Sequence, residues 1–93
     1  MNDYDVINIR DIAPYISELG WKLLDYLNKK EYNTMNEMKG LLKCGDIRLF
    51  TELRILETAL LLKRKFQDNN GKKKVYYITL HGMEILKYKP EEE

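Results

Sequence analysis

The chain has little of what catalytic and metal sites are built from. Its 93 residues include one histidine, one cysteine and one serine, Ser17. His81 and Cys44 lie far apart, and one of each makes neither a zinc site nor a Cys–His nucleophile pair. No glycine-rich loop is present to hold a phosphate. We therefore expect no enzyme, no metal and no cofactor, and we interpret His81 as a surface or capping residue.

A single cysteine excludes an internal disulfide. We expect Cys44 to be a half-buried, small apolar side chain. A disulfide between the Cys44 side chains of two subunits is the less favoured alternative, because such bridges are unusual inside cells. No apolar run approaches the roughly 18 residues that span a membrane. The first residues are acidic, whereas a signal peptide begins with basic ones. These features predict a cytoplasmic protein without a membrane partner.

The formal net charge of +1 hides a strong asymmetry along the chain. Residues 62–74 contain six Lys or Arg and one Asp, a local charge of +5, whereas residues 1–20 contain one Arg and four acidic residues, a charge of −3. A polyanionic partner responds to such a local field and not to the average. The alternative is a solvated surface segment whose lysines only keep the protein soluble.

The length predicts one domain. We divide the chain into an N-terminal arm (1–13), a folded domain (14–89) and an acidic tail (90–93), with a short strand expected at Val6–Ile9. The first helix is expected over 14–30, because Pro14 suits a first helical turn. One apolar stripe at helical spacing supports this helix. Its members are Ile16, Leu19, Leu23 and Leu27.

Two further helices are expected next. Thr34 and Glu37 have the spacing of a capping box that begins the second helix, and Gly45 is expected to end that helix in the left-handed conformation. Asp46 is expected to cap a third helix over 47–61. The short connection between the two helices matches a helix-turn-helix. The expected apolar faces are Met35, Met38, Leu41 and Leu42 on the second helix, and Leu49, Leu53, Leu56 and Leu60 on the third.

A β-hairpin follows. Along residues 62–66 successive side chains are expected to alternate between inward and outward, and Leu62 and Phe66 are expected to point inward. Asn69-Asn70-Gly71 can supply the positive-φ residues of a tight turn, and 73–78 is the expected return strand. Thr79 then caps a last helix over 80–89. The fold class is therefore α+β and mostly α.

This order of elements resembles the winged-helix (winged helix-turn-helix) regulators of the MarR/PadR/ArsR type. Many of them carry an aromatic residue, one further residue, Leu-Thr, two residues and Gly; here this is Tyr76-Tyr77-Ile78-Thr79-Leu80-His81-Gly82, with Ile78 in place of Leu. The family's usual glycine before the strand is absent, and Thr58-Ala59 stands there. The resemblance implies a three-helix core, a two-stranded hairpin wing and a C-terminal helix, and it extends to small proteins of archaea and their viruses.

The resemblance also implies a function: sequence-specific binding of double-stranded DNA. A recognition helix at about 47–57 would enter the major groove, with Arg48, Thr51 and Arg54 near base edges or phosphates. The wing, at about 63–74, would contact the backbone or the minor groove. Its expected contact residues are Lys63, Lys65, Asn70, Lys72, Lys73 and Lys74. The alternative is a solvated helix face on which Glu52 and Glu57 pair with the arginines.

We expect a homodimeric transcriptional regulator, because two modules related by a two-fold axis read two half-sites. The arm and the last helix carry apolar residues that the small domain leaves uncovered. The expected dimer surface is Tyr4, Val6, Ile7, Ile9, Ile12, Tyr15, Ile85, Leu86 and Tyr88. The alternative is that the arm folds back over its own core. A rival function is a winged-helix protein–protein interaction module that does not bind DNA.

Overall fold

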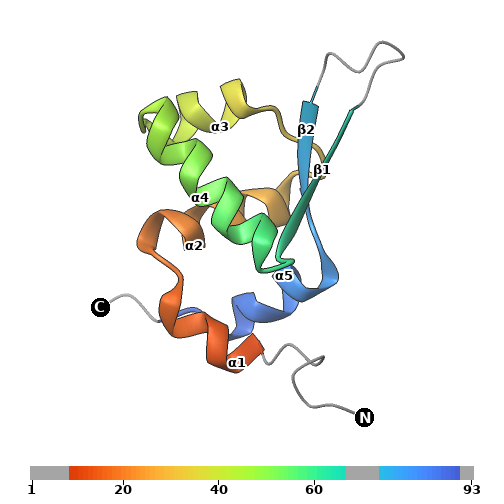
Figure 1. Ribbon diagram of the computed structural model, residues 1–93. Coiled ribbons are helices and arrows are strands. Elements are labelled where there is room, and N and C mark those ends of the chain that lie inside the picture. The colour runs from red at the N-terminus through yellow and green to blue at the C-terminus, as the bar shows by residue number, and fades with distance from the viewer. Residues whose placement is uncertain (1–8, 67–73, 91–93) are drawn as a thin grey trace.

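A computed structural model describes residues 9–66 and 74–90 of the protein. The described residues are mostly helical, with one antiparallel two-stranded hairpin beside the helices (Figure 1). None of these helices is long and apolar enough to cross a membrane. In chain order the elements are α1 (Ile9–Ile12), the 3-10 helix η2 (Ala13–Tyr15), α2 (Glu18–Lys29), α3 (Met35–Leu42), α4 (Asp46–Thr58), β1 (Leu62–Phe66), β2 (Lys74–Ile78), α5 (Leu80–Ile85) and the 3-10 helix η3 (Leu86–Tyr88).

The N-terminal part differs from the prediction. Ile9 begins α1 and is not the end of a strand. Pro14 lies in η2, which ends at Tyr15, and the next residue, Ile16, is extended, so the expected helix over 14–30 is two separate segments. The reason is Ser17, whose Oγ accepts the N–H of Gly20 at 3.0 Å and so caps α2. A serine at this position supplies an acceptor for one of the N–H groups that a helix start leaves free.

The start of α3 confirms the capping box. Thr34 Oγ1 accepts the Glu37 N–H at 3.3 Å, and the Glu37 carboxylate accepts from the Thr34 hydroxyl. The end of α3 does not follow the prediction, because the left-handed residue is Lys43 (φ 52°) and not Gly45. Gly45 is instead the extended residue that precedes α4, and Asp46 is the first residue of that helix. Leu41, expected on the buried face of α3, is 58% exposed.

The end of α4 forms a Schellman turn. Leu61 N–H donates to Leu56 O at 2.9 Å, and Leu60 N–H donates to Glu57 O at 3.0 Å. Leu60 itself is left-handed (φ 64°), a conformation that costs a non-glycine residue about 1 kcal/mol. Leu60 is therefore turned outward, 43% exposed, and not part of the buried stripe as expected; Leu61 is buried instead. A left-handed residue thus ends α4, and it is a leucine although glycine adopts this conformation without strain.

The hairpin pairs Leu62 with Ile78 and Phe66 with Lys74. Leu62 is buried as predicted, but Phe66 is 62% exposed, because it lies at the end of β1 farthest from α4 and nothing in the described chain covers it. A third extended segment joins the hairpin at Asn33, whose N–H and C=O both bond to Tyr76. The turn, with Asn70, Lys72 and Lys73, lies outside the described residues.

The start of α5 fits tightly against the end of α4. Thr79 Oγ1 accepts the Gly82 N–H at 3.0 Å and donates to Leu60 O at 2.7 Å. A Cβ on Gly82 would lie 2.1 Å from Leu61 O, so only glycine fits. We call Leu60, Leu61, Thr79 and Gly82 the joint. The helix after the joint is shorter than expected: α5 ends at Ile85, and η3 replaces its last turn.

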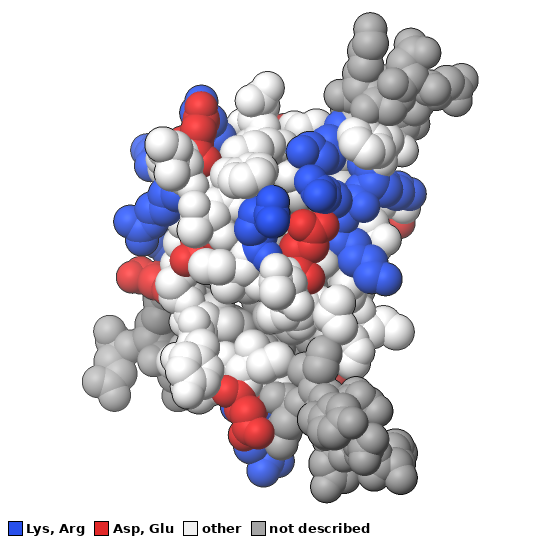
Figure 2. Space-filling view, in the orientation of Figure 1, with Lys and Arg blue, Asp and Glu red and all other residues white. Residues whose placement is uncertain are grey.

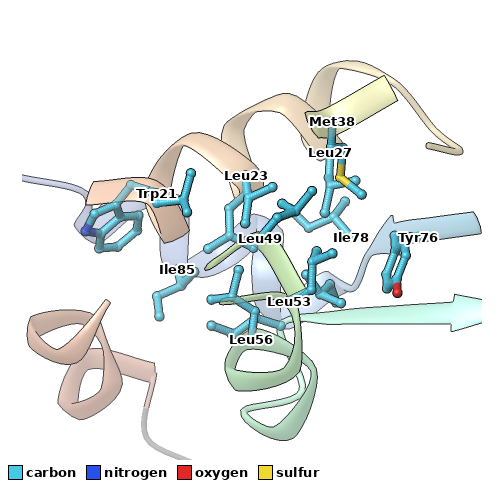
Figure 3. Close-up of a cluster of buried hydrophobic side chains, with 14 of the residues drawn as sticks. Trp21, Leu23, Leu27, Met38, Leu49, Leu53, Leu56, Tyr76, Ile78 and Ile85 are labelled. Atoms are coloured by element: carbon cyan, nitrogen blue, oxygen red, sulfur yellow. The ribbon is translucent and has the colours of Figure 1, made fainter. Parts of the chain in front are cut away.

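The core lies between α2, α4, the hairpin and α5 (Figure 3). α2 supplies Leu23 and Leu27, and β2 supplies Tyr76 and Ile78, all buried. Ile85 of α5 is fully buried in this core. The predicted inner stripe of α4 is confirmed for its first three members, Leu49, Leu53 and Leu56. Because these leucines anchor the inner side of α4, its opposite side is held out toward solvent.

Candidate nucleic-acid interface

Three side chains expected to contact DNA, Arg48, Thr51 and Arg54, are all exposed on α4. They do not form one row. Arg48 lines a hollow of about 380 Å³ between the start of α2 and the turn that connects α3 to α4. Arg54 lies on the side toward the hairpin, and Thr51 lies between the two arginines on the helix surface. Figure 1 shows α4 across the front of the molecule with the hairpin beside it.

The two glutamates on α4 have other partners than these arginines. Glu52 accepts a hydrogen bond from Ser17 Oγ at 2.7 Å. Glu57 forms an ion pair with Arg64 on β1, with 3.1 Å between Nε and Oε2. Over residues 9–66 and 74–90, no ion pair joins either glutamate to Arg48 or Arg54. The alternative that these groups neutralise one another is therefore wrong for the described chain.

Arg64 is an exposed cation beside α4 that the sequence did not single out. Burial raises the pKa of the Tyr76 hydroxyl. The guanidinium charges of Arg64 and Arg54 lie close enough to this hydroxyl to oppose the rise. Arg54 also lies over the Phe50 ring, 5.8 Å from its centroid, within cation–π range. Lys and Arg side chains gather over α4 and the hairpin, with acidic side chains among them (Figure 2). The boundary between α4 and β1 thus carries two arginines and Glu57, which is paired with Arg64.

The lysines of β1 lie on the other face of the hairpin. Successive residues of a strand point to opposite faces, so Lys63 and Lys65 face away from the side on which Arg64 meets Glu57. Lys65 Nζ donates to the Tyr32 hydroxyl at 3.0 Å and lies 4.2 Å from the centroid of that ring. This hydrogen bond raises the pKa of Lys65. Both lysines are exposed as expected, but they do not share the face of α4. Lys74, which begins β2, is half-buried.

The expected dimer residues divide into four groups. Tyr15 and Tyr88 are 86% and 42% exposed. Ile9, Ile12 and Leu86 are half-buried against the core of their own chain, so the described part of the arm packs on its own domain. Ile85 is fully buried, and its prediction as a dimer contact is wrong because none of its side chain reaches the surface. Tyr4, Val6 and Ile7 lie outside the described residues.

Neither the histidine nor the cysteine has neighbours that suggest chemistry. In the described part of the chain, no group of three or more His, Cys, Asp or Glu side chains could hold a metal ion. His81 is exposed at the start of α5. Cys44 is half-buried against the core, which confirms that part of its prediction.

Comparison with solved structures identifies the type of fold. No protein-family model and no curated protein sequence matches the chain. Solved structures do match. A cysteine-to-serine mutant of E. coli MarR complexed with operator DNA has a TM-score of 0.72 at 18% identity, over 86% of this chain and 59% of that one. A mutant of S. aureus MepR bound to an oligodeoxyribonucleotide has a TM-score of 0.71 at 20% identity, over 76% and 53%. The Thermotoga maritima transcriptional regulator Tm0710 has a TM-score of 0.75 at 17% identity, over 85% and 57%.

The chain has the winged-helix fold of the MarR-type regulators. This confirms the predicted fold class and the resemblance on which it was based. In winged-helix terms, α3 and α4 form the helix-turn-helix and β1 with β2 forms the wing. The chain spans between 53% and 59% of the length of these three relatives.

Proposed function

We propose that this protein is a transcriptional regulator that binds specific sequences of double-stranded DNA as a homodimer. The observation that carries the proposal is the outer side of α4, which is exposed, flanked by arginines and directly beside the wing. Two of the structurally similar proteins, MarR and MepR, are seen in complexes with DNA. In this proposal α4 lies in the major groove and the wing lies along the backbone or the minor groove.

In this arrangement the charged residues would have different roles in binding DNA. Arg54 and Arg64, on adjoining elements, would lie near the same stretch of sugar-phosphate backbone, where their contacts position the protein. Arg48, in the first turn of α4, would be free to reach a base edge, since Arg pairs bidentately with guanine. The lysines of the wing tip, Lys72 and Lys73, would add phosphate contacts. They remain predictions, because they lie outside the described residues.

The small size of the domain and the position of its exposed tyrosines support the homodimer. A single module of this size contacts few base pairs, whereas two related by a two-fold axis read half-sites about one helical turn apart. α1 and η3 lie at the end of the molecule opposite the wing (Figure 1). Two exposed tyrosines, Tyr15 in η2 directly after α1 and Tyr88 in η3, offer apolar surface to a second copy. Contacts there would leave α4 and the wing free to bind DNA.

A second candidate function is a protein–protein interaction module. The observation that favours it is the apolar content of the outer side of α4, where Ile47 is 85% and Ile55 51% exposed. Contiguous exposed apolar side chains often mark a surface that binds another protein. The two candidates make opposite predictions about duplex DNA.

Selection of bound duplexes from a random pool tests the proposal. We expect an enriched palindrome, whose affinity falls steeply as salt rises, because each neutralised phosphate contributes a slope of about −0.9 to log K against log salt. Changing Lys72, Lys73 and Lys74 together to Ala should flatten that slope. If the purified protein retains no duplex even at low salt, the DNA proposal is wrong and the second candidate replaces it.

A further inference from the structure

The outer side of α4 carries a row of methyl groups. Ile47, Thr51 and Ile55 are spaced four residues apart, so their side chains lie one above the other along the helix. All three are exposed. A shallow hollow of about 410 Å³, lined by Phe50, Thr51, Arg54, Ile55 and Thr58, continues this apolar surface toward the end of the helix. We call Ile47, Thr51 and Ile55 the methyl row.

Thr51 belongs to the row through its methyl group and not through its hydroxyl. Its Oγ1 donates to Ile47 O, one helical turn earlier, at 2.7 Å. A threonine that bonds back in this way holds its hydroxyl against the helix backbone. The methyl group is then the part of the side chain that faces away from the helix. The row therefore presents branched alkyl groups along its length.

The edges of the row are cationic. Arg48 lies on the side toward α2, and Arg54 with Arg64 lies on the side toward the wing. Glu57 is paired with Arg64, and Glu52 is hydrogen-bonded to Ser17, so Arg48 and Arg54 are the two cations at these edges that pair with neither glutamate. An apolar row between two positive edges is complementary to a major groove, which has a floor of base edges between two walls of phosphate. A protein partner would require no such pair of positive edges.

We propose that the methyl row reads thymine 5-methyl groups in the major groove, an inference that rests on the proposed DNA-binding function. The thymine methyl is the apolar feature that distinguishes A·T pairs in this groove. From Ile47 to Ile55 the helix rises about 12 Å. At about 3.4 Å per base pair this covers three to four successive pairs. The preferred half-site is then a short A·T run bordered by guanine opposite Arg48.

The test removes the methyl groups from the DNA alone. The probe is the duplex enriched from the random pool, synthesised with deoxyuridine in place of one thymine at a time. This exchange deletes the 5-methyl group and leaves the base-pairing atoms. We expect an affinity loss of about fourfold per methyl group that contacts the row, at two or three adjacent positions in each half-site, and no loss at thymines outside the half-sites.

Variants of the protein connect each position to a side chain. Ile47→Ala and Ile55→Ala change exposed residues, so the fold is retained, and each should abolish the deoxyuridine effect at a different position. The matched control is Leu41→Ala, which removes an exposed leucine from α3 and should leave every deoxyuridine effect in place.

Two results would overturn the inference, and they are distinguishable. If the protein binds the enriched duplex equally well after every thymine is replaced by deoxyuridine, thymine reading is wrong while the DNA-binding function stands. If no duplex is retained at low salt, both proposals fail, and the methyl row becomes a candidate contact surface for another protein.

Discussion

The joint and the outer side of α4 are built in opposite ways. At the joint, the hydroxyl of Thr79 serves two backbone groups and the space beside Gly82 is filled by Leu61 O. On the outer side of α4, Ile47 and Arg48 are exposed to solvent and Arg48 has no ion-pair partner among the described residues. The motif that suggested the winged-helix resemblance lies in the joint. The residues of this motif therefore serve the packing of the fold. The side chains that would contact DNA lie on an exposed surface that the packing of the core does not require.

The largest expected effect comes from filling the joint. Gly82→Ala places a Cβ against Leu61 O, and we expect the free energy of unfolding to fall by about 3 kcal/mol, as for severe overpacking. Urea denaturation measures this loss. The matched control is Gly40→Ala in α3, where nothing lies within 4 Å of the new Cβ and a gain of about 0.5–1 kcal/mol is expected. Equal effects at the two glycines would contradict the account of the joint.

The next effect belongs to the outer side of α4. Arg54→Ala should weaken binding of the enriched duplex by about 1.5–3 kcal/mol, as for a lost hydrogen bond to a charged group, because it removes a phosphate contact at the boundary between α4 and the wing. The free energy of unfolding should change by about 0.5 kcal/mol or less, as is usual for surface substitutions. Binding titrations and urea denaturation of the same sample separate the two quantities. Lys65→Ala, on the opposite face of the hairpin, is the control and should weaken binding less.

A smaller effect, and one of opposite sign, is expected at Leu60. Leu60→Gly relieves the left-handed strain at the end of α4 and should raise the free energy of unfolding by about 1 kcal/mol. Leu60→Ala shortens the side chain without relieving the strain, so it should give no such gain. Thermal unfolding of the two variants checks the difference. A glycine variant no more stable than the alanine variant would show that Leu60 is not strained.

The smallest effect is at the cap of α3 and depends on pH. The hydrogen bond from Lys30, with a further one from Thr34, lowers the pKa of Glu37. A lowered folded-state pKa adds stability above the ordinary glutamate value, about 4.3, and that stability is lost as pH falls through the folded-state value. Glu37→Gln should therefore flatten the fall in stability between about pH 5 and pH 3. The exposed Glu84, changed to Gln, is the control and should leave the acid limb unchanged.

Local signals in the sequence identified most of the fold. The capping threonines, Thr34 and Thr79, and the inner leucines of α4 act through neighbours three or four residues away, so their spacing alone was enough. Ser17 was missed because Pro14 offered an earlier start for the same helix. Lys43 and Leu60 were missed because glycine is the usual signal of a left-handed residue, and in both cases a side chain occupies that position instead.

The sequence predicted less of the candidate site than of the fold. Helical periodicity was enough to place Arg48, Thr51 and Arg54 on the exposed side of α4. Periodicity was not enough to find Arg64. The alternation of a strand places Arg64 and its neighbouring lysines on opposite faces of the hairpin, but it does not say which of these faces meets α4. That assignment depends on the contact between Arg64 and Glu57, which only the folded chain shows.

The most direct test of the account is to record the backbone amide NMR spectrum of the ¹⁵N-labelled protein while the enriched duplex is added. We predict shifts along the outer side of α4, at Ile47 through Ile55, and at Arg64 on the wing, with little change at Tyr32 or at the joint. Shifts confined to Tyr32, Tyr77 and the opposite face of the hairpin, with α4 unaffected, would contradict the claim that α4 is the helix that meets DNA.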